Sequence, residues 1–65
     1  MRFYTTNGVE FPQDLIELKI ERETTVLEIC LPFYKGRNFC RENNVEYYVS
    51  CGWVCVTHYN FVVRL

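Results

Sequence analysis

The stretch "LIELKIERETTVLEICL", residues 15–31, decides the fold class because its apolar residues recur at every second position. Isoleucine and leucine alternate with charged residues over 16–20, and a similar alternation returns over 27–31 after the polar break "ERET". A period of two is typical of strands with one buried face. We therefore predict an antiparallel hairpin in which residues 15–21 pair with residues 25–31.

A helix is the competing interpretation of the first half of this stretch. Residues 13–23 are mostly good helix formers, and Pro12 stands where a proline is tolerated before a helix. The strict alternation favours the strand, so the hairpin is the prediction and a helix over 13–23 is the alternative.

A second hairpin is predicted at the N-terminus. Asn7-Gly8 lies between two apolar and aromatic runs, and this pair favours a hairpin turn because both residues tolerate positive φ. Pro12 is expected to end the second strand, since proline has no N–H to give to a neighbouring strand.

The middle of the chain, residues 32–44, breaks the strand pattern. Pro32 and Gly36 interrupt it, and Asn43-Asn44 is typical of a turn or a helix stop. We expect an irregular segment here, with at most a short helical turn over 38–42.

A third hairpin is predicted within "VEYYVSCGWVCVT", residues 45–57, with Cys51-Gly52 as its two-residue turn. This turn pairs Ser50 with Trp53, Val49 with Val54, Tyr48 with Cys55 and Tyr47 with Val56. One face of the hairpin is then an apolar core face and carries Val45, Tyr47, Val49, Val54 and Val56. The other face is mixed and carries Tyr48, Ser50, Trp53, Cys55 and Thr57.

These elements predict a single compact domain over residues 1–65. The fold class is all-β, or α+β with one short helix, and the architecture is a small antiparallel sheet or a partly closed barrel built from hairpins. The 65 residues are 49% hydrophobic and 17% aromatic, which excludes a disordered tail. A chain this short has a marginal core, so a metal, disulfides or a homodimer formed by strand pairing would help to stabilise it.

The cysteine-rich stretch "CGWVC" is a candidate metal site, but its spacing argues against one. In an extended strand the Cα atoms of Cys51 and Cys55 would lie about 13 Å apart, too far to share a zinc ion or a disulfide. His58 falls on the opposite strand face from Cys55. We therefore predict no metal and no cofactor. A structural zinc is the alternative, and its candidate ligands are Cys40, Cys51, Cys55 and His58. It would need a local helix or bulge, with Cys40 or Cys30 brought in from a distant part of the chain.

Aromatic and cationic residues alternate in "FYKGRNFCR", residues 33–41, which is typical of a recognition surface. We predict a partner-binding site made of this segment and of two residues on the mixed hairpin face. Its members are Phe33, Tyr34, Lys35, Arg37, Phe39, Arg41, Tyr48 and Trp53. The same mixture can stack bases and neutralise phosphates, so a small module for RNA or single-stranded nucleic acid, with or without zinc, is the alternative function.

Several function classes are not expected. The chain has one histidine, no phosphate-binding glycine motif and no nucleophile-base arrangement, so we predict that it is not an enzyme. The net charge of −1 gives no overall attraction to nucleic acid or to an anionic membrane. The charge is nevertheless uneven: residues 1–31 carry three positive and six negative side chains, whereas residues 32–65 carry four positive and two negative.

The predicted function is therefore non-catalytic binding of another protein. The N-terminal residues lack the apolar core of a secretory signal, which predicts a cytoplasmic location and reduced cysteines. No membrane partner is expected, because the uncharged stretch 47–63 is rich in strand formers and holds several polar residues. A small aromatic-rich chain also has the style of viral accessory proteins that inhibit a host enzyme or defence complex, in which case the location would be the host cytoplasm.

Overall fold

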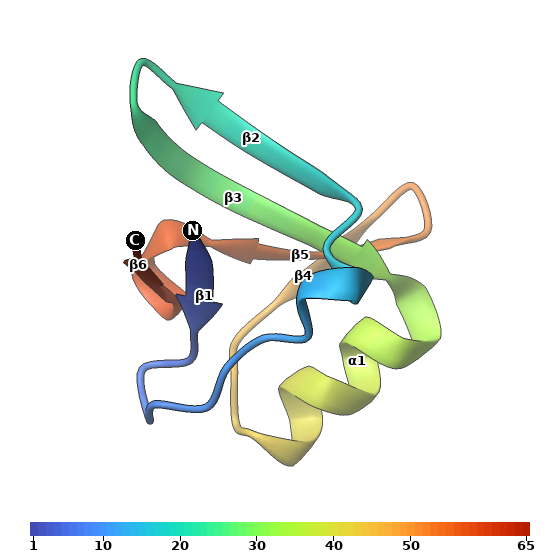
Figure 1. Ribbon diagram of the computed structural model, residues 1–65. Coiled ribbons are helices and arrows are strands. Elements are labelled where there is room, and N and C mark those ends of the chain that lie inside the picture. Colours follow the sequence, from blue (N-terminus) through green and yellow to red (C-terminus); the bar gives the residue numbers. More distant parts are fainter.

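The computed structural model describes residues 1–65 and consists of two open antiparallel sheets and one α-helix (Figure 1). The strands are β1 (Arg2–Tyr4), β2 (Leu18–Arg22), β3 (Thr25–Pro32), β4 (Tyr48–Ser50), β5 (Trp53–Thr57) and β6 (Val62–Arg64), and the helix is α1 (Phe33–Glu42). The larger sheet has the order β2-β3-β5-β4, and β1 pairs with β6. The predicted β-rich class with one helix is confirmed, and the sheets do not close into a barrel.

The hairpin predicted from residues 15–31 is present as β2 and β3. Leu18 pairs with Cys30 and Arg22 with Thr25, and the turn between the strands places Glu23 at a φ of 58°. The strand begins later than predicted because Gln13–Leu15 form one 3₁₀ turn after Pro12. The alternative helix over 13–23 is therefore wrong, although its first residues do coil once.

The C-terminal hairpin follows the predicted register. Tyr48 pairs with Cys55, Val49 with Val54 and Ser50 with Trp53. Cys51 and Gly52 both have positive φ, 52° and 80°, as a type I′ turn requires. Local turn chemistry was therefore sufficient to set this pairing.

The middle segment differs from its prediction, because α1 covers ten residues instead of one turn over 38–42. Pro32 precedes the helix, where its missing N–H costs no helical hydrogen bond. The helix ends as expected at the asparagine pair: Asn44 has a φ of 56°, and the N–H of Val45 donates to the Cys40 carbonyl at 2.8 Å. This is the Schellman arrangement, with asparagine in place of the usual glycine.

Gly36 lies inside α1 because the helix packs very close to the sheet. A Cβ atom at this position would be 2.7 Å from the Cβ of Leu31 and 3.0 Å from the Cβ of Val54. The glycine therefore marks the contact between helix and sheet, not an interruption of regular structure.

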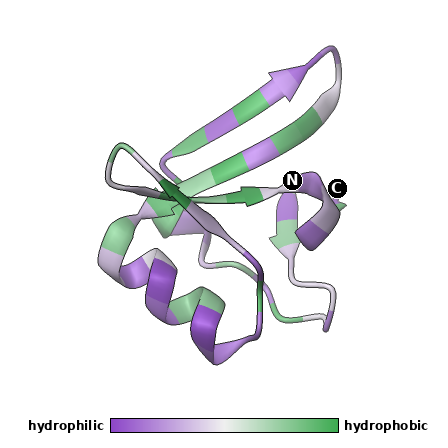
Figure 2. Cartoon of the chain, turned by 180° about the vertical axis from the view of Figure 1, so that it is seen from behind, coloured by the Kyte–Doolittle hydropathy of each residue, from purple (hydrophilic) through white to green (hydrophobic).

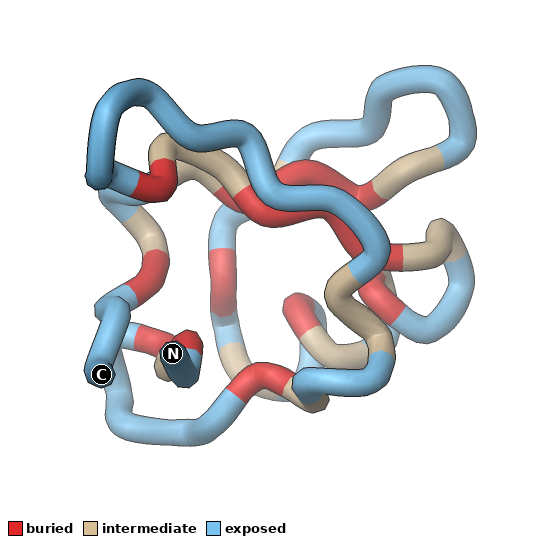
Figure 3. Tube along the Cα trace, turned by 45° about the horizontal axis from the view of Figure 1, so that its top comes forward, coloured by how far each residue is buried: buried red, intermediate tan, exposed pale blue.

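The core lies against the face of the larger sheet that α1 covers, and β3 and β5 carry its longest buried segments (Figure 3). The helix and the N- and C-terminal segments close it from the other side. Its members are Phe3, Phe11, Val26, Ile29, Leu31, Cys40, Val45, Val54, Val56 and Phe61. Of the predicted core face, Val45, Val54 and Val56 are buried and Tyr47 packs against the cluster. The prediction was wrong for Val49, which is 50% exposed because β4 is a short strand at the sheet edge.

The predicted N-terminal turn forms, but the strands on either side of it barely pair with each other. Gly8 has a φ of 92°, and the N–H of Thr5 donates to the Val9 carbonyl at 2.7 Å. Only one bridge, between Tyr4 and Glu10, follows the turn, and β1 makes its ladder with β6 instead. The two termini consequently lie side by side (Figure 1). No helix reaches the length and apolarity needed to span a bilayer.

Candidate functional site

The residues predicted to bind a partner lie on two opposite sides of the larger sheet. Six belong to α1, namely Phe33, Tyr34, Lys35, Arg37, Phe39 and Arg41. The other two are Tyr48 and Trp53, on the face that α1 does not cover, because their strand neighbours Val49 and Val54 lie on the helix side. The structure therefore brings the helical residues together and separates them from the hairpin pair.

Three of the six helical residues are exposed and three are half-buried. Tyr34 is 71% exposed, and Lys35 and Arg41 also point to solvent. Phe39 instead packs inward, with its ring 4.9 Å from that of Phe11, and Phe33 packs against the core cluster. We call the outer part of the helix, Tyr34, Lys35, Arg37, Asn38 and Arg41, the helix surface; its polar character is visible in Figure 2.

Arg37 lies at the edge of the helix surface and stacks on two aromatic rings. Its guanidinium carbon is 5.2 Å from the ring centroid of Phe33 and 5.8 Å from that of Tyr34. These contacts fix the planar group by cation–π attraction. Its Nε atom is buried and makes no hydrogen bond.

The cations of α1 have no carboxylate partner within the chain. The protein has a single ion pair, in which Arg2 and Glu10 approach to 3.8 Å at the N-terminal turn. Lys35, Arg37 and Arg41 therefore form no ion pair, and they share α1 with one exposed acidic residue, Glu42, and with the exposed ring of Tyr34.

The uncovered side of the sheet, which we call the outer face, carries residues from all four strands. Cross-strand pairing places Leu18, Cys30, Cys55 and Tyr48 in one row and Ile20, Glu28 and Thr57 in the next. The outer strands leave apolar groups in solvent: Leu18 is 50% exposed, and Ile20 and Tyr48 are also exposed. In the centre, Cys30 and Cys55 are only 3% and 4% exposed.

The two central cysteines of the outer face are in direct contact. Cys30 and Cys55 are opposite residues on β3 and β5, and their Sγ atoms are 3.7 Å apart as free thiols. Burial, and then the neighbouring Cys55 and Glu28, raise the pKa of the Cys30 thiol from 9.0 to about 12. Both the desolvation and the adjacent acidic groups disfavour a thiolate, so Cys30 is not an activated nucleophile.

Tyr48 and Glu28 are joined above this cysteine pair. The Tyr48 hydroxyl donates a hydrogen bond to the Glu28 carboxylate, so the tyrosine side chain reaches from β4 across β5 to β3. This bond, with the carboxylate charge, holds the pKa of Tyr48 above its usual range. We call this hydrogen-bonded pair, Tyr48 and Glu28, the clamp, because it links β4 to β3 next to the two thiols.

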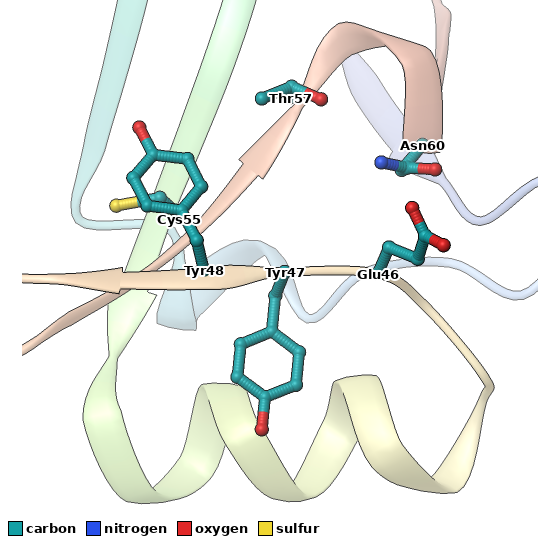
Figure 4. Close-up of a pocket in the computed structure, with 6 residues that line it drawn as sticks. All are labelled: Glu46, Tyr47, Tyr48, Cys55, Thr57 and Asn60. Atoms are coloured by element: carbon teal, nitrogen blue, oxygen red, sulfur yellow. The ribbon is translucent and has the colours of Figure 1, made fainter.

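A shallow cavity of about 200 Å³ opens beside the clamp (Figure 4). It is lined by Glu46, Tyr47, Tyr48, Cys55, Thr57 and Asn60. Tyr48 and Tyr47 point to opposite sides of the strand, with Tyr47 directed at α1, while the Glu46 carboxylate and the Asn60 amide face each other across the cavity. The cavity is small for an organic ligand, since most such pockets measure about 300–1,000 Å³.

The candidate zinc ligands of the sequence are not gathered at one place. Cys40 is buried on the inner side of α1, Cys51 is exposed in the β4–β5 turn, and His58 is exposed in the 3₁₀ turn after β5. Cys55 instead lies beside Cys30 and Glu28. The potential ligand atoms of these three residues all lie within 4.8 Å of one another. This cluster could be predicted only from the pairing of β3 with β5, and no local sequence pattern indicates that pairing.

A second cavity, of about 320 Å³, lies between the termini and the β2–β3 turn. It is mainly apolar, and its lining includes Met1, Val26, His58, Phe61 and Leu65. His58 stacks on Tyr59 at 4.1 Å between ring centroids and has no acidic partner. This arrangement provides no pair of groups for acid–base catalysis.

Comparison of the chain with family models, curated proteins and solved structures found no match.

Proposed function

We propose that this protein is a non-catalytic binding module that engages an acidic segment of another protein through the helix surface. The single observation that carries the proposal is that three cations without an intramolecular ion pair, Lys35, Arg37 and Arg41, lie on one ten-residue helix with the exposed ring of Tyr34. An acidic partner would supply the carboxylates that these cations lack. Charge complementarity of this kind favours encounter and orients the partner.

The aromatic groups of α1 support the same function. Tyr34 exposes most of its ring, and arginine and tyrosine are among the residues that most often dominate binding energy in protein interfaces. Arg37 is held in place by Phe33 and Tyr34 before any partner arrives. A side chain ordered in advance loses less conformational entropy on binding.

Nucleic acid is the less favoured partner. The helix surface offers three cations and one well-exposed ring, whereas modules for single-stranded nucleic acid combine a long basic groove with a series of stacking aromatics. Homodimerisation through the exposed edges of β2 and β4 also stays a prediction, as does inhibition of a host enzyme in the manner of a viral accessory protein.

A pair of charge-reversal variants tests the proposal. Lys35→Glu/Arg41→Glu changes the helix surface, while Lys19→Glu/Arg22→Glu makes the same change in net charge on exposed residues of β2. Both variants and the parent are immobilised and exposed to the same cell extract, and the retained proteins are quantified. We expect the helix variant alone to lose the proteins that the parent retains.

Three results would contradict this function. Equal loss in both variants would show that net charge, not the helix surface, governs retention, and no loss in either would remove the helix surface as the binding site. A single-stranded oligonucleotide that binds the parent at low salt, and is released by Lys35→Glu/Arg41→Glu and by added salt, would establish nucleic acid as the partner instead.

A further inference from the structure

Three metal-binding side chains converge at the centre of the outer face. Glu28 and Cys30 come from β3 and Cys55 from β5, and each offers one ligand atom within 4.8 Å of the other two. The three share a face because Cys30 is two residues from Glu28 on the same strand and lies opposite Cys55. Two rigid central strands of a four-stranded sheet therefore position all three groups.

The spacing of the sulfur atoms suits a tetrahedral metal. Two thiolates on one zinc ion, each bonded at about 2.3 Å, lie about 3.8 Å apart, and the Sγ atoms of Cys30 and Cys55 are 3.7 Å apart. We propose that Cys30, Cys55 and Glu28 form a site for a single zinc ion. Two soft sulfur ligands favour Zn²⁺ over the oxygen-seeking Mg²⁺ and Ca²⁺.

Tyr48 positions the carboxylate ligand. Its hydroxyl donates to one oxygen of Glu28, the Oε2 atom, which leaves the other oxygen available to the metal. Outer hydrogen bonds of this type orient metal ligands and commonly contribute 10- to 100-fold in affinity. Tyr48 is therefore a positioning residue for the site.

The cavity beside Tyr48 gives the ion a route and a fourth ligand. Cys55 and Tyr48 both line this space, so it borders the cluster (Figure 4). Three protein ligands leave one tetrahedral position, which a water molecule from the cavity fills. Each thiol transfers its proton to solvent as its Zn–S bond forms, so the uptake of one Zn²⁺ releases two protons.

Cobalt substitution tests the site with a direct spectroscopic readout. Reduced, metal-free protein is titrated with Co²⁺, and we expect a thiolate-to-cobalt charge-transfer band that saturates at one ion per chain and is bleached by Zn²⁺. Cys30→Ala and Cys55→Ala should lower the affinity by more than about 100-fold, since each removes a ligand. Tyr48→Phe should lower it by about 10-fold, since only the outer hydrogen bond is lost.

Matched cysteine variants provide the control. Cys51→Ala and Cys40→Ala should bind cobalt like the parent, because neither thiol belongs to the cluster. If Cys51→Ala abolished the band, the ligands would be those of the turn and this assignment would be wrong. The absence of any charge-transfer band in the parent would likewise overturn it.

A measurement on the unaltered chain separates the site from effects on folding. Zinc added to the ¹³C-labelled parent should shift the Cβ resonances of Cys30 and Cys55 and leave those of Cys40 and Cys51 in place. Shifts at all four cysteines, or at none, would contradict the proposal even if the Cys30 and Cys55 variants failed to fold.

Discussion

Gly36 and Leu31 approach so closely that a Cβ atom on the glycine would lie 2.7 Å from the Cβ of Leu31. The contact joins the middle of α1 to the end of β3, which directly precedes the helix. Because the atom that a new methyl group would meet is itself near the backbone, the clash cannot be relieved by rotating a flexible side chain. The close packing of α1 against the sheet therefore requires a residue without a side chain at position 36.

Gly36→Ala should destabilise the protein although alanine is the better helix former. Overpacking a core costs about 1–3 kcal/mol, whereas removing a glycine from a helix interior returns about 1 kcal/mol, so we expect a net loss of up to about 2 kcal/mol. Asn38→Ala, at an exposed helix position, should stabilise by up to about 0.7 kcal/mol. Urea unfolding of the two variants decides the matter, and a Gly36→Ala protein as stable as the parent would show that helix and sheet are not in tight contact.

The turn between β4 and β5 offers a stabilising change. Cys51 has a φ of 52° without being glycine, and asparagine adopts this conformation far more readily in type I′ turns. Cys51→Asn should therefore raise the free energy of unfolding by about 1 kcal/mol, the order of the left-handed penalty. In a chain of 65 residues this corresponds to about 4–8 °C in Tm.

The β-branched variant Cys51→Val is the matched control for this turn. Valine resists positive φ, so this variant should melt below the parent even though the side chain is exposed and loses no packing. If asparagine and valine gave the same Tm, the positive φ at residue 51 would not limit the stability of the hairpin.

Alkaline pH should destabilise the protein through Cys40. Burial raises the pKa of this thiol from 9.0 to about 11, so between these values the folded state keeps a proton that the unfolded state loses. Its stabilising contribution is complete below pH 9 and falls by about 1.4 kcal/mol per pH unit towards pH 11. Urea unfolding at a series of pH values measures this slope.

Cys40→Ala isolates that contribution. The Cys30 thiol, whose pKa is also raised by burial, adds a comparable slope, so between pH 9 and pH 10 the variant should retain about half of the parent's pH dependence. Above pH 10 the raised pKa of Tyr48 adds a further slope to both proteins. Its stability at neutral pH should be lower by about 1 kcal/mol because the substitution leaves a small cavity under α1. An unchanged slope in Cys40→Ala would mean that the thiol ionises equally in both states.

Local chemistry made parts of the fold predictable from the sequence. The turn at Cys51-Gly52 and the helix stop at Asn44 depend on residues adjacent in the chain, and both formed as expected. Gly36 was misread because its role depends on Leu31 and Val54, and the contact with Val54 exists only after β5 pairs with β3. From the sequence alone, a glycine that interrupts a helix or strand cannot be distinguished from one that allows two elements to pack closely.

The two candidate sites also differ in how far the sequence predicts them. The segment 33–41 stood out because aromatic and cationic residues follow one another in sequence, although the helix then turned two of its aromatic rings towards the core. The contact between Cys30 and Cys55 spans 25 residues and a complete helix. Only the pairing of two non-consecutive strands brings these thiols together, and the sequence offers no local pattern for it.

Tyr34→Ala separates binding from folding on the helix surface. The ring is 71% exposed and contributes little to the core, so its removal should leave the Tm within a few degrees of the parent. If the helix surface is the binding site, affinity for a partner that it retains should fall by about 30-fold, the effect of losing a hot-spot residue worth about 2 kcal/mol.

Tyr59→Ala is the matched control for this variant, because Tyr59 is 80% exposed but lies outside α1. Surface plasmon resonance with the captured partner compares the two, and only Tyr34→Ala should shorten the lifetime of the complex. Equal losses would indicate a general contribution of exposed rings. A large drop in Tm for Tyr34→Ala would instead make the ring a structural support of Arg37, which stacks on it at 5.8 Å, and would move the binding site away from α1.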